Sequence, residues 1–91
     1  MNRKIVTERT YALGQYQNIK LHDEIEVPEE LYLNTELVEK LRGLQFVQLE
    51  LMFRKYLRLQ TELEQFNLED SINALTELKS NTLSDINKIL E

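Results

Sequence analysis

Apolar residues recur at steps of three and four through residues 34–66, the spacing that places side chains on one face of an α-helix. This span has no proline, and Gly43 is its only glycine. The pattern predicts one long helix whose apolar surface is wide enough to need cover from more than one side. Two neighbouring apolar stripes make up that surface, the first formed by Leu37, Leu41, Leu44, Val47 and Leu51, the second by Leu49, Met52, Tyr56, Leu59, Leu63 and Phe66.

Residues 4–27 follow a different period, an alternation of apolar and polar residues that is typical of strands with one buried face. Glycine and asparagine in residues 14–18 favour a turn in the middle of this segment. We therefore predict a β-hairpin. A pairing centred on Tyr16 keeps apolar residues together and places Arg9 opposite Asp23, as cross-strand pairing favours.

A short helical turn is expected after the hairpin, over residues 29–33. Pro28 cannot donate a hydrogen bond to a strand ladder, whereas the acidic residues that follow it suit the first turn of a helix. Asn34 or Thr35 can then cap the long helix with its side-chain oxygen.

Helical spacing returns in residues 67–91, which are predicted to form a second helix. Residues 80–82, Ser-Asn-Thr, form helices weakly and mark the place where this helix would break or kink. A short turn between two helices makes them antiparallel neighbours. The expected fold is α+β but mostly α, one domain over 1–91: an N-terminal β-hairpin (4–27), a short turn plus a long amphipathic helix (28–66), and an antiparallel C-terminal helix that completes a helical hairpin.

The composition fits a small folded domain, with 91 residues of which 42% are hydrophobic and 30% charged. The net charge of −5 divides into −2 for residues 1–33, zero for residues 34–66 and −3 for residues 67–91. Binding to nucleic-acid backbones is therefore not expected, because it requires a basic stripe. No cysteine is present, and no apolar run approaches the roughly 20 residues of a membrane span. We expect a soluble, cytoplasmic protein.

Residues that could carry catalysis are few. His22, the only histidine, falls on the outer face of a predicted strand, where an ordinary surface position is expected. Ser71, Ser80 and Ser84 lie at helix starts and junctions, where capping accounts for them. Glycines occur only at positions 14 and 43, which leaves no glycine-rich loop for phosphate. We expect no enzymatic activity, no cofactor and no metal site.

The apolar surface of the long helix carries the functional prediction. Homodimers are the commonest closed assemblies, and a second copy could bury a stripe that one chain leaves uncovered. We expect a non-enzymatic protein–protein interaction module that forms a homodimer through this helix, in the manner of a coiled coil, and that binds a further protein partner. The predicted interface consists of Leu49, Met52, Phe53, Tyr56, Leu59 and Leu63.

Two alternatives remain open at this stage. The acidic first and last thirds of the chain could imitate phosphates for a basic cleft, which would make the protein a small regulator or inhibitor of a nucleic-acid-handling protein. The segment over residues 11–20 resembles hairpins in short proteins of phage and mobile-element type and lends slight support to that role. Direct binding of nucleic acid would instead need the basic side chains of the long helix combined across a dimer, namely Arg42, Arg54, Lys55 and Arg58.

Overall fold

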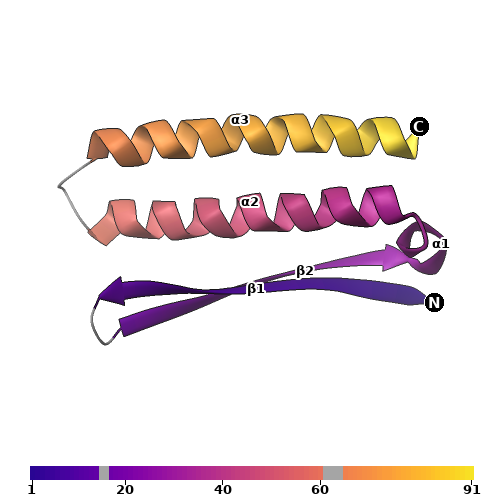
Figure 1. Ribbon diagram of the computed structural model, residues 1–91, viewed down its shortest axis with the longest axis horizontal. Coiled ribbons are helices and arrows are strands. Elements are labelled where there is room, and N and C mark those ends of the chain that lie inside the picture. Colours follow the sequence, from indigo (N-terminus) through magenta and orange to yellow (C-terminus); the bar gives the residue numbers. More distant parts are fainter. Residues whose placement is uncertain (15–16, 61–64) are drawn as a thin grey trace.

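The chain folds as an N-terminal antiparallel β-hairpin followed by helices, which confirms the predicted fold (Figure 1). The computed structural model describes residues 1–14, 17–60 and 65–91. Within these residues the elements are β1 (Asn2–Gly14), β2 (Gln17–Pro28), α1 (Glu29–Tyr32), α2 (Thr35–Gln60) and α3 (Gln65–Leu90).

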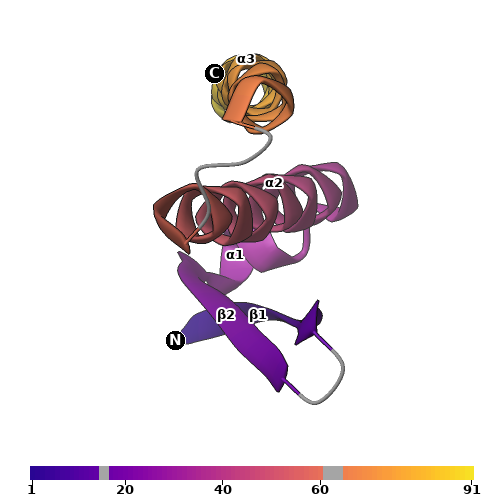
Figure 2. The ribbon, with the colours of Figure 1, turned by 90° about the vertical axis from the view of Figure 1, so that its left-hand side faces the viewer.

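The long helix α2 lies between the hairpin and α3, so that the molecule has three layers (Figures 1 and 2). Helices α2 and α3 run antiparallel to each other, as the short connection between them predicted (Figure 1). The resulting body measures 46 × 27 × 15 Å along its principal axes. The expectation that the apolar surface of the long helix is covered from two sides is confirmed, by the hairpin on one side and α3 on the other.

The two strands pair over nearly their whole length, but the predicted register is wrong by two residues. Arg9 lies opposite Leu21 instead of Asp23, and the pairing shifts between Ala12 and Gly14, where Gly14 comes opposite Gln17. The expected turn residues 15 and 16 lie outside the described part of the chain. A displacement of two residues keeps each side chain on its face of the sheet, which is why the buried face was still predicted correctly.

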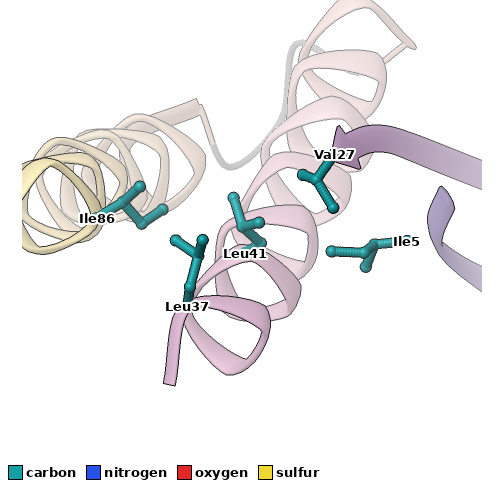
Figure 3. Packing of buried hydrophobic residues seen from close by; sticks show 5 residues of the cluster. All are labelled: Ile5, Val27, Leu37, Leu41 and Ile86. Carbon is teal, nitrogen blue, oxygen red and sulfur yellow. The ribbon is translucent and has the colours of Figure 1, made fainter. Parts of the chain in front are cut away.

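The main core cluster joins all three layers. Figure 3 shows Leu41 of α2 between the strand residues Ile5 and Val27 on one side and Ile86 of α3 on the other, with Leu37 beside it. Ile5 is fully buried and Leu37 nearly so. An isolated two-stranded hairpin is marginal in water, so burial of its inner face against α2 is what stabilises it.

A second cluster lies between the two long helices and consists of Val47 and Leu51 of α2 with Ile72 of α3. Ion pairs flank the helix pair, including Arg58 with Glu69 at an N–O distance of 2.7 Å. The side chains of both ion-pair partners are more than a third exposed, so packing of the apolar residues contributes most of the stability at this contact.

The helix starts follow the expected capping chemistry. Pro28 is the residue before α1, and its φ of −60° suits that position. The side-chain oxygen of Asn34 accepts a hydrogen bond from the backbone N–H of Leu37 at 3.1 Å, so Asn34 is the cap of α2. The predicted end of the long helix at Phe66 does not hold, because Phe66 belongs to α3, and residues 61–64 lie outside the described part of the chain.

Helix α3 continues without interruption through residues 80–82, where we expected a break or kink. The hydroxyl of Thr82 donates a hydrogen bond to the carbonyl of Leu78 at 2.8 Å, and Thr76 bonds in the same way to Ile72. Both hydroxyls therefore find a hydrogen-bond acceptor one turn earlier in the same helix. Helix α2 likewise continues through Gly43.

Candidate interaction surface

The structure divides the predicted interface residues into two groups, and the first group is used within the chain. Leu49 is 0% exposed, so its side chain belongs to the interior of the single chain. The ring of Phe53 stacks on Tyr11 of β1, with ring centroids 4.2 Å apart and planes inclined by 17°. Such stacking adds to the area that both rings bury and fixes the end of the hairpin against α2.

Met52 and Tyr56 form the second group, which reaches the surface. Met52 is 45% exposed and Tyr56 is half-buried. The two residues are four positions apart, so their side chains are neighbours on one face of α2. Leu59 and Leu63 continue this spacing in the sequence, but the side chain of Leu59 and all of Leu63 lie outside the described part of the structure.

A polar cluster around Glu50 connects all three layers, and the sequence pattern did not predict it. The Glu50 carboxylate accepts hydrogen bonds from Arg9 at 2.8 Å and from the Tyr11 hydroxyl at 3.0 Å, and also from Arg54. Arg54 donates in turn to the Ser71 hydroxyl of α3 at 2.5 Å. The spacing of Glu50 and Arg54, four residues apart on a helix, is the one signal in the sequence that indicates part of this cluster.

The surroundings of Glu50 favour its ionised form. Burial by itself opposes ionisation, but the hydrogen bonds from Arg54 and Tyr11, together with the charges of Arg54 and Arg9, outweigh it and lower the pKa of the Glu50 carboxyl. Burial raises the pKa of the Tyr11 phenol, and its hydrogen bond to the negative Glu50 raises it further. At neutral pH the cluster therefore holds one carboxylate, two guanidinium groups and one neutral phenol.

Acid is expected to weaken the link between the layers because the pKa of Glu50 is lowered by folding. A carboxyl whose pKa is lower in the folded chain stabilises the fold above its unfolded pKa of about 4.3, and this stabilisation is lost as the pH falls through the folded value. Chemical denaturation of the wild type should show stability falling below about pH 4.5. Glu50→Gln should be less stable at pH 7 and show a shallower fall, and equal slopes for both proteins would contradict this assignment.

The helix pair carries a groove on the side where Gly43 lies. The groove has a volume of about 340 Å³ and is lined by Glu39, Lys40, Gly43, Val47, Leu78 and Thr82. A Cβ atom built on Gly43 would meet no heavy atom within 4 Å, so packing within the chain does not require a glycine there. Phe46, one turn further along α2, is 46% exposed, and the guanidinium carbon of Arg9 lies 5.8 Å from the centre of its ring.

A larger hollow of about 490 Å³ lies where the start of α2 meets the end of α3. Its walls carry both signs of charge, and Lys40 pairs across it with Asp85 at 3.3 Å. His22 is exposed, with Glu24 at 3.5 Å. Among the described residues, no group of three histidine, aspartate, glutamate or cysteine side chains is placed to hold a metal ion.

The four basic side chains named above for nucleic-acid contact are divided between two settings. Arg54 and Arg58 are ion-paired with Glu50 and Glu69, whereas Arg42 and Lys55 are exposed. In the described ranges, no helix is both long and apolar enough to cross a membrane. Comparison of the chain with protein-family models, with curated proteins and with solved structures gives no match.

Proposed function

We propose that this protein is a non-enzymatic protein–protein interaction module that self-associates through the side of α2 that carries Met52 and Tyr56. The partner at this surface is a second copy of the chain. Leu49 and Phe53 act as interior residues that hold α2 in place, and Leu59 and Leu63 continue the surface in the sequence.

The extended shape of the chain carries this proposal. Its accessible surface is 6709 Å², whereas a compact monomer of 10.9 kDa exposes about 5,600 Å². Its radius of gyration is 15.4 Å, against about 12 Å for a compact domain of this length. The excess of about 1,100 Å² exceeds the roughly 800 Å² that each partner contributes to a standard interface.

The chemistry of the two exposed residues suits an interface. Methionine has a flexible, polarisable side chain that adapts to an opposing surface, and tyrosine combines an apolar ring with a hydroxyl that tolerates water at the rim. The sequence positions 52, 56, 59 and 63 advance by four, three and four, which is the spacing of helices that pair in coiled coils. A two-fold pair would bring the same residues together from both copies.

The distribution of surface charge does not favour the alternative role as an acidic inhibitor. Opposite charges alternate over the described surface, as in the pairs Lys20–Glu8 at 3.3 Å and Arg3–Glu29 at 3.5 Å. A phosphate mimic needs one sign of charge over a continuous area. The inhibitor role therefore stays a prediction from the sequence. The nucleic-acid-binding role and the cytoplasmic location also stay predictions.

Solution mass tests the proposal. Light scattering over a concentration series should give a multiple of 10.9 kDa that persists in high salt, since the contact is apolar. Met52→Asp should lower this mass at least twofold, because the new carboxylate would be buried without a partner. Leu78→Asp is the matched control and should leave the mass unchanged. Leu78 is 49% exposed and lies on α3 beside Gly43.

The control separates an effect specific to the Met52 side of α2 from the general effect of replacing an exposed apolar residue by a charged one. Gly43 and Met52 are nine residues apart, which at about 100° per residue places them on opposite sides of α2. A mass of one chain at every concentration would overturn the proposal. A Met52→Asp protein that keeps the wild-type mass would overturn it as well.

A further inference from the structure

One edge of the hairpin pairs with no described strand. In the part of the chain that the structure describes, the sheet has two strands, so β1 has β2 on one side and no strand on the other. Strand β1 is 13 residues long. A long strand edge with free N–H and C=O groups is a template for pairing with another strand.

The hydrogen bonds of Gln45 show which backbone groups point to that edge. Its side-chain nitrogen donates to the carbonyl of Ile5 on β1 at 2.6 Å and to that of Asp23 on β2 at 3.2 Å. One nitrogen reaches both carbonyls only if both point into the space between the strands. Backbone groups alternate in direction along a strand, so Lys4, Val6 and Glu8 direct their N–H and C=O groups to the free edge.

The side chains of these same residues lie on the face of the sheet that α2 does not cover. Lys4, Val6, Glu8 and Thr10 are all exposed. Val6 is 41% exposed and sits midway between Lys4 and Glu8. A β-branched apolar residue between two opposite charges is a self-complementary pattern when a strand meets a copy of itself antiparallel.

We propose that β1 pairs antiparallel with β1 of a second copy in a register centred on Val6. Val6 then lies opposite Val6 of the copy, and Lys4 lies opposite Glu8 in both directions. Glu8 also pairs with Lys20 of its own chain at 3.3 Å, so its carboxylate then has a lysine partner in each chain. Centring on Ile5 or on Thr7 would instead place Val6 opposite a charged residue.

The charges on the face of the sheet that packs on α2 do not oppose this register. Arg3 comes opposite Arg9 of the copy there, but each arginine already has a carboxylate partner within its own chain. The like charges are therefore neutralised before the two strands meet.

Helix α2 is consistent with this arrangement. Four paired strands span about 19 Å and two packed helices need about 10 Å each, so two α2 helices fit side by side on one sheet. The contact of Arg9 with Phe46 shows that the exposed Phe46 lies on the β1 side of α2, and Gly43 lies one turn before it.

The opposite edge of the hairpin is less suited to the same pairing. Strand β2 ends at Pro28, which lacks an N–H group, and it carries Glu24 and Glu26 at neighbouring positions on its outer face. Proline and clustered charge are features that discourage pairing at a strand edge. Pairing between copies is therefore favoured at the β1 edge.

A proline scan of the two edges tests the proposal. Val6→Pro removes an outward N–H group and leaves the β1–β2 ladder in place, because that N–H is not part of it. Glu24→Pro is the matched control, since Glu24 lies directly opposite Val6 and faces the other edge. Val6→Pro should halve the particle mass measured by light scattering, and Glu24→Pro should leave it unchanged. The reverse result, or an unchanged mass for Val6→Pro, would overturn the proposal.

Charge exchange gives an independent test that does not disturb the backbone. Lys4→Glu should weaken the assembly at least tenfold in dissociation constant, because it places two carboxylates opposite each other. Adding Glu8→Lys should restore association. If Val6→Pro fails to fold, as judged by circular dichroism, this pair of variants decides alone, and absence of rescue would overturn the register.

The β1 edge and the Met52 side of α2 are separate surfaces, so the size of the assembly shows which of the two contacts is present. Two distinct two-fold contacts on one chain give tetramers or open chains, and the wild type should therefore reach at least four chains. Val6→Pro should leave a dimer held by the Met52 surface, Met52→Asp a dimer held by β1, and the double variant a monomer. If only the β1 contact exists, the wild type is a dimer that Val6→Pro separates and Met52→Asp does not.

Discussion

Replacing Leu49 with alanine is expected to lower the free energy of unfolding by about 2–5 kcal/mol. Leu49 is 0% exposed, and truncation would remove buried methyl groups and leave a cavity that rigid neighbours cannot fill. Leu83→Ala provides the control, because Leu83 is 41% exposed and a surface truncation changes stability by only about 0.5 kcal/mol.

Denaturant unfolding at several protein concentrations separates this effect from self-association. Because Leu49 is buried within the single chain, the loss should be the same at every concentration. A loss below about 1 kcal/mol would show that Leu49 does not belong to the interior of the chain. A loss that grows with concentration would instead make Leu49 an interface residue, as the sequence pattern first indicated.

The second large effect is expected at Gln45. Its side chain is 0% exposed and connects α2 to both strands: its oxygen accepts a hydrogen bond from the Thr7 hydroxyl at 2.7 Å, and its nitrogen donates to two strand carbonyls. Gln45→Leu should lower the free energy of unfolding by about 2–3 kcal/mol, since it leaves the buried Thr7 hydroxyl without this partner.

A double-mutant cycle checks the cause. Thr7→Val removes the other half of the hydrogen bond, and replacing both partners by apolar groups of similar shape should cost clearly less than the sum of the two single changes. If the two losses in free energy of unfolding simply add, Gln45 and Thr7 act independently. The amide of Gln45 would then stabilise the fold only through its bonds to the strand carbonyls.

Several features of the fold followed from local patterns. Alternation in the first third of the chain indicated strands, and steps of three and four indicated helices, because these periods decide which side chains share a face. Pro28 and Asn34 marked helix starts through chemistry that involves only neighbouring residues. The break expected at residues 80–82 did not occur, because packing of α3 on α2 outweighs the weak helix propensity of three residues.

The strand register and the role of each apolar residue on α2 could not be obtained in this way. A shift of two residues leaves the buried face of a strand unchanged, so the sequence pattern does not distinguish the two registers. Leu49 and Met52 both fit the helical apolar pattern, yet one is buried and the other exposed.

Local patterns were enough to predict the kinds of element, their order and the need of the long helix for cover on two sides. These features depend on the periodicity of side chains and on capping within a few residues. Where that cover ends depends on how the elements pack, because the twisted hairpin and α3 each contact only part of the surface of α2. The Glu50 cluster contains hydrogen bonds between residues up to 41 positions apart and exists only once the layers have packed. The exposed Met52 surface and the free edge of β1 are likewise what packing leaves uncovered.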